Sequence, residues 1–293
     1  MQDEIDLFAN RLALTLGSQA QYDSDAGAGV QPTARLIWKG IPRQRIWVAT
    51  SRALRTPSLT DRGIRIDYPP VPSASGLPLV VTVLGNPAAK TETFVDAEAG
   101  YRVEIGTAAW VIVTGYVGRY NDLQTKELST PIVQFVPSPQ IFVSSQFGNQ
   151  LTATTRGLEV AAQWAPVQIW RLDGSYTAFH VTPQLAAASQ DPAAATADAN
   201  APRAQWQVRS TSSVGRATLN IAVFHVGPLE QLQVAAYTRA DVNAEWRFTS
   251  RLSAMAIGQN LFDAAHAEFG SADSLLLATQ VPRSVNLRLR WTF

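Results

Sequence analysis

The last nine residues of the chain alternate strictly between apolar and polar side chains. One parity holds Val285, Leu287, Leu289, Trp291 and Phe293, and the other holds Asn286, Arg288, Arg290 and Thr292. Because successive side chains of a strand point to opposite faces, this pattern predicts a strand with one apolar and one cationic face. The apolar face ends in an aromatic residue at the C-terminus, and the polar face contains no acid. These features are typical of a membrane β-barrel strand, which faces lipid on one side and a polar lumen on the other.

Composition narrows the class of protein only slightly. The chain has 293 residues, 46% of them hydrophobic, and a net charge of +1, so it offers no basic excess for nucleic acid. Cysteine is absent, which excludes disulfide scaffolds and thiolate metal sites. No stretch approaches 18 uninterrupted apolar residues, so no transmembrane helix is expected. A barrel does not need one, because its strands alternate.

Strand-like segments recur along the whole chain. The most regular interior segment, residues 93–105, places Asp96, Glu98, Arg102 and Glu104 on one parity and apolar residues on the other. Together the segments predict an all-β fold, an antiparallel transmembrane β-barrel of about twelve strands. The predicted strands are residues 7–21, 31–39, 45–54, 93–105, 109–120, 155–164, 169–179, 203–213, 217–226, 232–248 and 251–261, and the terminal strand that ends at residue 293.

The connections between these segments are alternately short and long. The long ones are residues 56–90, 121–150, 182–201 and 263–280, and short ones include residues 40–42 and 165–167. If neighbouring strands are antiparallel, each kind falls on one end, as in outer-membrane barrels with short periplasmic turns and long extracellular loops. A soluble β-sandwich rarely repeats such a one-sided rule. Seven tryptophans near the short turns or the C-terminus predict an interfacial girdle: Trp38, Trp47, Trp110, Trp164, Trp170, Trp246 and Trp291.

The charges on the polar parity have two interpretations. They could line a substrate path, or they could pair across neighbouring strands inside the lumen. The second is favoured because neighbouring strands mix the two signs, as cross-strand ion pairs require. The residues are Asp96, Glu98, Arg102, Glu104, Arg239, Asp241, Glu245 and Arg247.

Several motifs, in order, resemble the C-terminal part of TonB-dependent outer-membrane receptors. The most specific motif is Gln259-Asn260-Leu261-Phe262-Asp263, followed by Pro282-Arg283-Ser284 and the terminal Arg290-Trp291-Thr292-Phe293. Weaker matches upstream are Ser51 to Ser58, Gly85-Asn86-Pro87 with Glu92, Glu98 to Arg102, Tyr120 to Leu123, Arg156 to Glu159 and Trp170 to Tyr176.

The resemblance carries several expectations. It implies that residues 1–293 are the C-terminal half of a 22-stranded receptor barrel without a plug domain. In intact form such a receptor would sit in the outer membrane and take up siderophore–metal complexes, cobalamin or a similar nutrient with TonB-derived energy. The nutrient would bind at the extracellular loops. Leu287, Leu289, Trp291 and Phe293 match the pattern implied to be recognised by the barrel insertion machinery.

Because Met1 to Asp6 resemble neither a secretory signal nor a TonB box, the chain is expected to be a natural truncation, a split gene product or a fragment. The TonB system would then act only if the missing N-terminal part is supplied.

Two other classes of function fit the sequence less well. A self-contained twelve-strand pore, such as an autotransporter translocator, has a similar length and also ends in Phe, but does not call for the motifs at residues 259–263 and 282–284. An outer-membrane hydrolase is disfavoured because no nucleophile motif is present. His180, His225 and His266 are too far apart for a local metal motif, so no enzyme activity, metal or cofactor is predicted.

Overall fold

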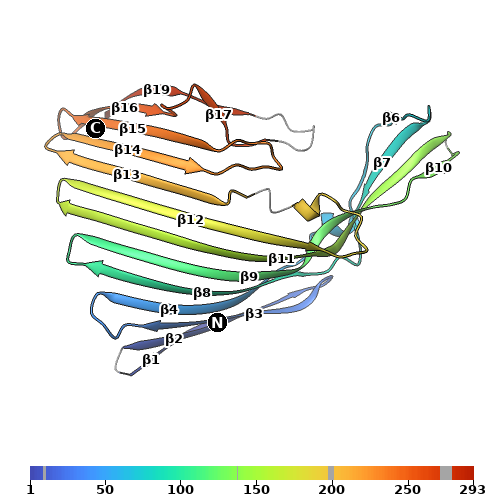
Figure 1. Cartoon of the computed structure of the whole chain (residues 1–293), viewed down its shortest axis with the longest axis horizontal. Helices are drawn as coiled ribbons and strands as arrows, with labels where there is room; N and C mark the ends of the chain where they lie inside the picture. The colour runs from blue at the N-terminus through green and yellow to red at the C-terminus, as the bar shows by residue number, and fades with distance from the viewer. Residues whose placement is uncertain (9–10, 137, 197–200, 271–278) are drawn as a thin grey trace.

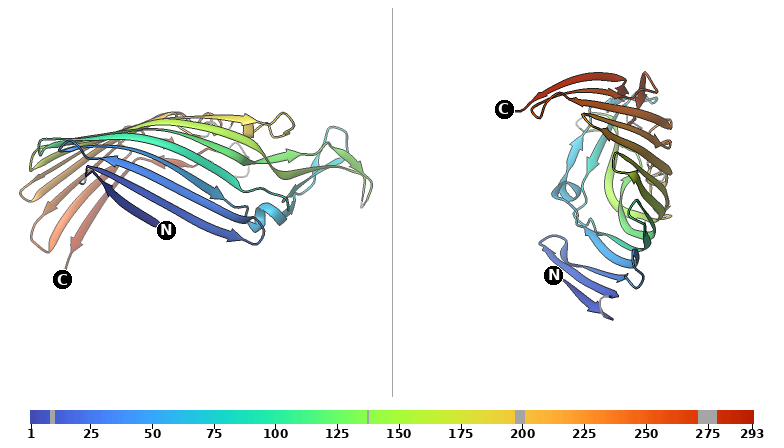
Figure 2. Two further views of the ribbon diagram at one scale, coloured as in Figure 1. Left: turned by 90° about the horizontal axis from the view of Figure 1, so that it is seen from below. Right: turned by 90° about the vertical axis from the view of Figure 1, so that its left-hand side faces the viewer.

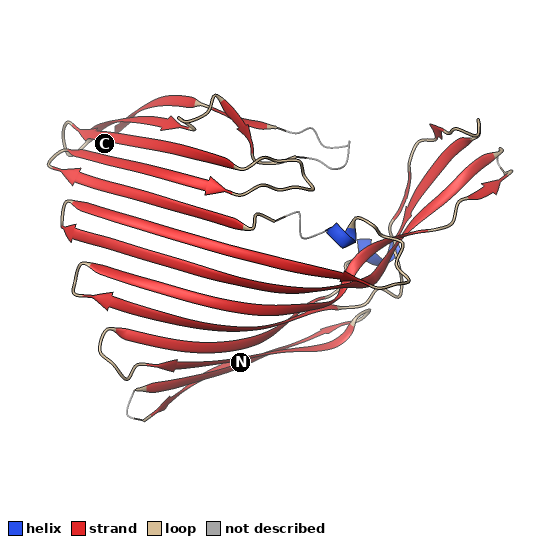
Figure 3. Cartoon of the chain, viewed as in Figure 1, coloured by secondary structure: helices blue, strands red, loops and turns tan. Residues whose placement is uncertain are grey.

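Almost the whole chain forms one sheet, in which all strand pairs but one are antiparallel among the described residues (Figure 3). The computed structural model describes all residues except 9–10, 137, 197–200 and 271–278. Within the described residues, the main sheet has 17 strands, of which four lie in an extension and thirteen form a continuous wall. The wall strands are β1 (Gln2–Leu7), β2 (Leu12–Asp23), β3 (Gly27–Trp38), β4 (Gln44–Arg55), β8 (Glu92–Ile105), β9 (Ala109–Leu128), β11 (Gln140–Val167), β12 (Trp170–Leu185), β13 (Ala204–Val214), β14 (Ala217–Val226), β15 (Tyr237–Arg247), β16 (Leu252–Gln259) and β19 (Ser284–Trp291).

Each wall strand pairs with the next in antiparallel register (Figure 1). The wall curves into an open trough, with β1 and β19 at its two edges (Figure 2). No register joins β1 to β19 among the described residues. The antiparallel all-β prediction is confirmed. In the same described part of the chain, no helix is long and apolar enough to cross a membrane.

The two faces of the wall have opposite character. Apolar side chains point to the convex side and are exposed there, including Leu158 (43% exposed), Leu219 (40%) and Leu287 (85%). Few residues are buried, and several of these are polar, such as Thr125 and Thr155 on the concave face. This arrangement inverts the usual burial of a water-soluble domain and follows from the two-residue period of the strands.

Short turns and long connections lie at opposite ends of the wall, with one exception, the β2–β3 turn. The turns β1–β2, β3–β4, β8–β9, β11–β12, β13–β14 and β15–β16 lie at one end, which we call the short-turn end (Figure 1). The opposite, open end carries the long connections and also the tight β2–β3 turn, which the sequence did not predict. The Asp23 carboxylate accepts hydrogen bonds from the N–H groups of Asp25 and Ala26, and Gly27 adopts φ 81°. These features allow the hairpin to close with a short turn.

The predicted first strand, residues 7–21, is wrong at its start. Leu7 ends β1, and β2 begins at Leu12. Phe8 adopts φ 50° and its carbonyl accepts the Arg11 N–H at 3.2 Å, which turns the chain. The connecting residues contain neither glycine nor proline, so the usual turn signal is missing.

The predicted irregular loops contain regular structure. β9, β11 and β12 run well into residues 121–150 and 182–201, and residues 56–90 contain α1 (Leu59–Gly63), β5 (Arg65–Asp67), β6 (Val71–Pro72) and β7 (Pro78–Leu84). β7 pairs in parallel with Ile141–Gln146 of β11, and β10 (Ile132–Gln134) pairs with the start of β11. These strands form an extension beyond the open end (Figure 1). Its strands are short or, like β7 with the sequence PLVVTVL, continuously apolar without alternation, so periodicity did not predict it.

Candidate functional site at the concave face and its open end

A belt of aromatic and charged side chains crosses the concave face near the short-turn end. The Arg35 guanidinium lies 5.8 Å from the Trp47 ring centre, and Arg102 lies 5.3 Å from the Trp110 ring centre. A Cβ on Gly100 would come within 2.0 Å of the Trp47 indole, so the glycine makes room for the ring. The predicted girdle is therefore wrong for Trp47 and Trp110. Both are on the concave face, where cationic residues cover them.

The belt continues through hydrogen bonds into β12. The Trp110 Nε1–H donates to Gln163 Oε1 at 3.1 Å, and the Gln163 amide donates to Asp173 at 2.9 Å. Asp173 also accepts from Arg171 Nε at 2.9 Å. Three neighbouring strands, β9, β11 and β12, are thus tied side chain to side chain as well as through the backbone.

The predicted cross-strand ion pairs are largely replaced by pairs along single strands. Arg102 pairs with Glu104 at 3.3 Å, and Arg239 pairs with Asp241 at 3.3 Å, each two residues apart. The directly opposite neighbours of Arg102 are Arg45 and Ile112, neither of which is an acid. Residues i and i+2 share a face of a strand, so a long arginine side chain reaches the acid on its own strand instead.

A polar and aromatic hollow of about 230 Å³ lies on the concave face toward the open end. Six of its lining residues have the inward parity of β12, β13 and β14: Ser175, Thr177, Gln205, Gln207, Phe224 and Val226. The Arg239 guanidinium lies 4.8 Å from the Phe224 ring centre at the edge of the hollow. The hollow therefore offers amide and hydroxyl groups beside an aromatic ring and a cation.

The predicted motif residues converge at the end of β16. Asn260 is fully buried, its N–H donates to Asp241 Oδ1 at 3.0 Å, and its amide donates to the Val281 carbonyl at 2.9 Å. Leu261 N–H bonds to the Ala240 carbonyl. The remaining motif contacts join Arg283 Nε to the Asp263 carbonyl at 3.2 Å and Ser284 Oγ to Gln259 Oε1 at 3.4 Å. Phe262 is 61% exposed, and Pro282 lies in β18 (Gln280–Pro282), which pairs with β17 (Ala265–Ala267).

These contacts, which we call the clamp, attach both ends of the last long connection to the wall. A series of side-chain contacts through Arg239 links the clamp to the hollow. Arg239 binds both Asp241, the partner of Asn260, and Glu268, at 3.0 Å. Glu268 lies 3.2 Å from His266 Nε2, and the His266 ring stacks on Tyr237 with ring centres 4.2 Å apart. His266 is thus a packed histidine on β17.

A second cluster anchors the long connection between β4 and β8. Ser58 and Asp61 form a capping box at the start of α1. Arg55 bonds to Glu92 at 2.6 Å and lies 3.6 Å from Asp61, while the Gln124 amide donates to Asp61 at 2.9 Å. Burial raises the pKa of Asp61, but the Ser58 N–H, the Gln124 amide, the Ser58 hydroxyl and the Arg55 charge together bring that pKa below its usual value.

The connection between β12 and β13 is tied to β9 in a similar way. Glu127 accepts the Ser189 hydroxyl at 2.8 Å and the Gln190 N–H at 2.6 Å. Asp191 accepts the Lys126 N–H at 2.7 Å. The described parts of three long connections are therefore held by carboxylates at the open end.

The predicted assembly residues lie on the edge strand and just beyond it. Leu287, Leu289 and Trp291 share the convex face of β19 and are 85%, 72% and 68% exposed. Phe293 is 99% exposed, with its ring centre 5.4 Å from that of Trp291. The structure does not bring them into contact with the motif cluster on the concave side.

All strands of the wall except β19 match a known protein family. The model of the TonB-dependent receptor-like β-barrel matches residues 1–261. The chain belongs to this family. Members of the TonB-dependent receptor barrel family are outer-membrane transporters of Gram-negative bacteria, not enzymes.

Solved TonB-dependent receptors share this wall. The siderophore receptor PirA from Acinetobacter baumannii aligns with a TM-score of 0.76 at 14% identity, over 100% of this chain and 45% of that one. A mutant of the ferric enterobactin receptor PfeA from Pseudomonas aeruginosa gives 0.72 at 16% identity, over 100% and 44%. The copper transporter OprC gives 0.63 at 17% identity, over 98% and 46%. The chain thus spans less than half the length of these solved receptors. No curated protein matches it in sequence.

Sequence reasoning missed most of the residues that build the open end. Gln205, Gln207 and Phe224 lie in ordinary wall strands, and nothing in their spacing distinguishes them from the other residues of these strands. Asp61 could have been found, because Ser58 and Asp61 have the spacing of a capping box ahead of a helix.

The clamp yields a first prediction. Asn260→Ala should lower the free energy of unfolding by about 2 to 4 kcal/mol, because the Val281 carbonyl loses its partner and alanine must adopt the left-handed φ of 52°. A urea titration of the refolded chain measures the change in the free energy of unfolding. Limited proteolysis within residues 261–283 reports whether the connection is released from the wall.

Gln259→Ala is the matched control, since its bond to Ser284 is long and exposed, and it should change the free energy by less than about 0.5 kcal/mol. Equal effects at both positions would contradict the clamp.

The Asp61 cluster yields a pH prediction. Because the folded pKa of Asp61 lies below its unfolded value of about 3.9, its contribution to stability is complete above that pH and is lost as the pH falls through the folded pKa. The protection of the backbone amides around residues 58–64 against hydrogen exchange, relative to the intrinsic exchange rate at each pH, should therefore fall below about pH 4. In Asp61→Asn the segment should exchange faster at neutral pH and lose most of this acid-dependent step. A wild-type step that persists unchanged in Asp61→Asn would assign it to another group.

Proposed function

We propose that this chain is the C-terminal portion of an outer-membrane receptor barrel that takes up a metal chelate, cobalamin or a similar scarce nutrient with TonB-derived energy. The observation that carries the proposal is the hollow of about 230 Å³ on the polar concave face, at the end where the long connections are clamped to the wall. In this proposal the convex face contacts outer-membrane lipid, the short turns are periplasmic and the long connections are extracellular. The nutrient binds at the hollow and the connections around it.

The chemistry of the hollow supports a chelate as ligand. Amide and hydroxyl groups can replace part of the hydration of a polar ligand, while Phe224 offers an aromatic face beside the Arg239 cation. Among the solved receptors with the same wall are siderophore receptors and a copper transporter by name. The TonB system would act through parts of a receptor that lie outside the described wall.

The geometry of the edges disfavours a self-contained pore. β1 and β19 are separated by an unbroken series of antiparallel pairs, and both run toward the short-turn end. Pairing them would create a parallel contact in a wall whose other pairs are all antiparallel in the described structure. Completion by further antiparallel strands, as in a receptor barrel, avoids this contact.

Ligand binding tests the proposal directly. The chain is refolded into phospholipid vesicles, and quenching of tryptophan fluorescence is titrated with a ferric catecholate, a ferric hydroxamate, cobalamin and Cu²⁺. We expect binding of at least one of them, weakened about 5- to 100-fold by Gln207→Ala or Phe224→Ala, the range that loss of one buried polar or aromatic contact gives.

Leu219→Ala, on the convex face of the same strand as Phe224, is the control and should leave the affinity unchanged. Absence of binding by all four ligands, or equal loss in the control, would refute the hollow as the ligand site.

The terminal strand provides a separate test of membrane assembly. We propose that Leu287, Leu289, Trp291 and Phe293 are recognised by the barrel insertion machinery, because these apolar side chains lie exposed on and just beyond the edge strand β19. In a signal-bearing form of the chain, deletion of Phe293 should reduce the heat-modifiable protein in outer-membrane fractions. Thr292→Ala, on the opposite parity, should not. An unchanged yield after deletion would remove Phe293 from this role.

A further inference from the structure

A hollow of about 240 Å³ lies at the short-turn end of the last three wall strands, β15, β16 and β19. We call it the arginine hollow. Its charged lining residues are three arginines and one glutamate, and serine and threonine hydroxyl groups stand among them: Arg247, Arg251, Arg290 and Glu245. Positive charge therefore exceeds negative charge here, in a chain whose net charge is only +1.

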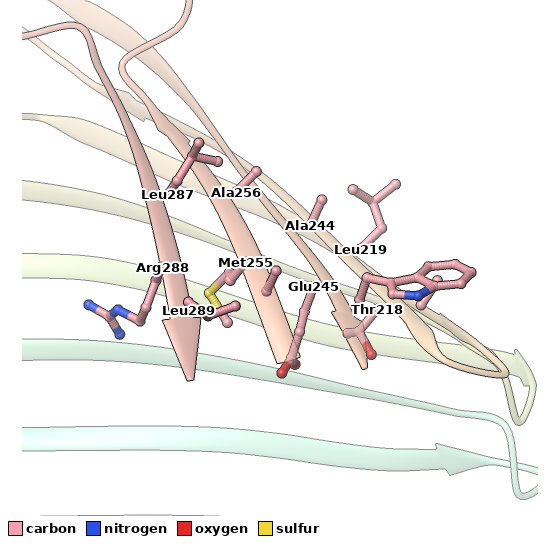
Figure 4. A pocket seen from close by; sticks show the side chains of 12 residues that line it. Thr218, Leu219, Ala244, Glu245, Met255, Ala256, Leu287, Arg288 and Leu289 are labelled. Atoms are coloured by element: carbon pink, nitrogen blue, oxygen red, sulfur yellow. The ribbon is translucent and has the colours of Figure 1, made fainter. Parts of the chain in front are cut away.

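The arginine hollow is on the concave side of the wall. Arg247, Ser253 and Arg290 lie directly opposite one another across the three strands. Arg290 has the parity of Arg288, which Figure 4 shows directed away from the convex Leu287. Two arginines thus flank a serine in one row, with their backbones about 10 Å apart, which is twice the spacing of neighbouring strands.

Hydrogen bonds hold the backbone of the third arginine in the turn between β15 and β16. The Thr249 hydroxyl accepts the N–H groups of Arg251 at 3.1 Å and of Leu252 at 3.0 Å. The Arg251 carbonyl accepts the Thr292 N–H at 2.9 Å, which ties the turn to the end of the chain. The backbone of Arg251 is therefore fixed, while its side chain is exposed at the hollow.

The three arginines have no acidic partner among the described residues. Elsewhere on the concave face an arginine pairs with the acid two residues away on its own strand, as Arg102 does with Glu104 at 3.3 Å. Glu245 has the same spacing from Arg247, yet the two form no ion pair in this part of the structure. Like charges that face one another across strands cost free energy, and a bound anion would remove this cost.

We propose that the arginine hollow binds a multiply charged oxyanion of the phosphate class. Guanidinium groups form charge-assisted, bidentate hydrogen bonds with phosphate and carboxylate oxygens. The Ser253 and Thr292 hydroxyl groups can donate to the remaining oxygens. A volume of about 240 Å³ is below the about 300–1,000 Å³ of pockets for drug-sized ligands and suits a compact anion.

The arginine hollow is separate from the hollow at Phe224. Arg247 is eight residues from Arg239 on β15, so the two sites are about 26 Å apart along the strand. The anion site follows from the wall itself and does not rest on the proposed uptake. Its ligand has two possible sources, a soluble phosphate compound or an anionic metal chelate that leaves the lumen at the short-turn end.

Anion titration tests the site. The chain is refolded into neutral detergent micelles, and pyrophosphate is titrated by calorimetry, with chloride at the same ionic strength as the reference. We expect saturable binding of pyrophosphate and none of chloride. Arg247→Gln with Arg290→Gln should weaken the affinity at least about tenfold, the factor that loss of one hydrogen bond to a charged group gives. Without the anion this variant should be at least as stable as the wild type, because it removes repulsion between like charges.

Arg45→Gln with Arg209→Gln is the matched control. Both arginines are exposed on the concave face outside the arginine hollow, opposite Arg102 and Asp173 respectively. The control removes the same charge and should change the affinity by less than about twofold, since screened charges at a distance contribute little. Heat-modifiability shows that each variant is folded. Absence of saturable binding by the wild type, or an equal loss in the control, would overturn the site.

Competition identifies the source of the anion. Three catecholates leave Fe³⁺ with excess negative charge, whereas three hydroxamates neutralise it. Displacement of pyrophosphate by a ferric tris-catecholate, and not by a neutral ferric trihydroxamate, supports the site and assigns it to anionic chelates. Displacement by neither supports a site for phosphate compounds. Displacement by both would overturn recognition by charge.

Discussion

The structure depends on the antiparallel backbone hydrogen bonds that join each wall strand to the next. In hydrocarbon an unpaired backbone group costs several kcal/mol, so strands can cross a membrane only when both of their edges are paired. The same pairing aligns residues of equal parity into rows across the sheet, as in Leu287, Ala256, Ala244 and Leu219. One register therefore creates a polar concave face and an apolar convex face together. The hollow on the concave face is a consequence of which side chains these rows bring together.

At the open end, side chains take over from the backbone in positioning the chain. Asp61, Glu127 and Asp241 each accept backbone N–H groups from a long connection or its junction with the wall. A carboxylate that accepts several donors is stable only with all of them in place, so each cluster specifies one arrangement of its connection. Through Arg239, the clamp at Asn260 also touches Phe224 in the concave hollow. A ligand that displaces Arg239 from this ring would disturb Asp241 and Glu268, and through them the last long connection.

The edge strand β19 combines two roles in one short segment. Its convex side chains are among the most exposed apolar residues in the described structure, and Leu287 and Leu289 also line an apolar hollow on the convex side of β14, β15, β16 and β19. Its concave side carries Arg288 and Arg290, which place positive charge at the rim of the lumen. Edge strands present unpaired backbone groups to any available partner. A strand with this amphipathic pattern can pair only with a neighbour that keeps its apolar side outward.

The sequence by itself determined the fold class, the faces of most strands and the end on which most connections lie, because a two-residue period expresses all three locally. It also identified the residues around Asn260 through their resemblance to a family, although not what they contact. Tertiary structure alone decided the strands of the extension, the concave positions of Trp47 and Trp110, and the pairing of Arg102 and Arg239 along their own strands. It also alone brought Gln205, Gln207 and Phe224 into one hollow. These features depend on which residues of different strands lie opposite one another, and that register arises from the pairing of segments far apart in the chain.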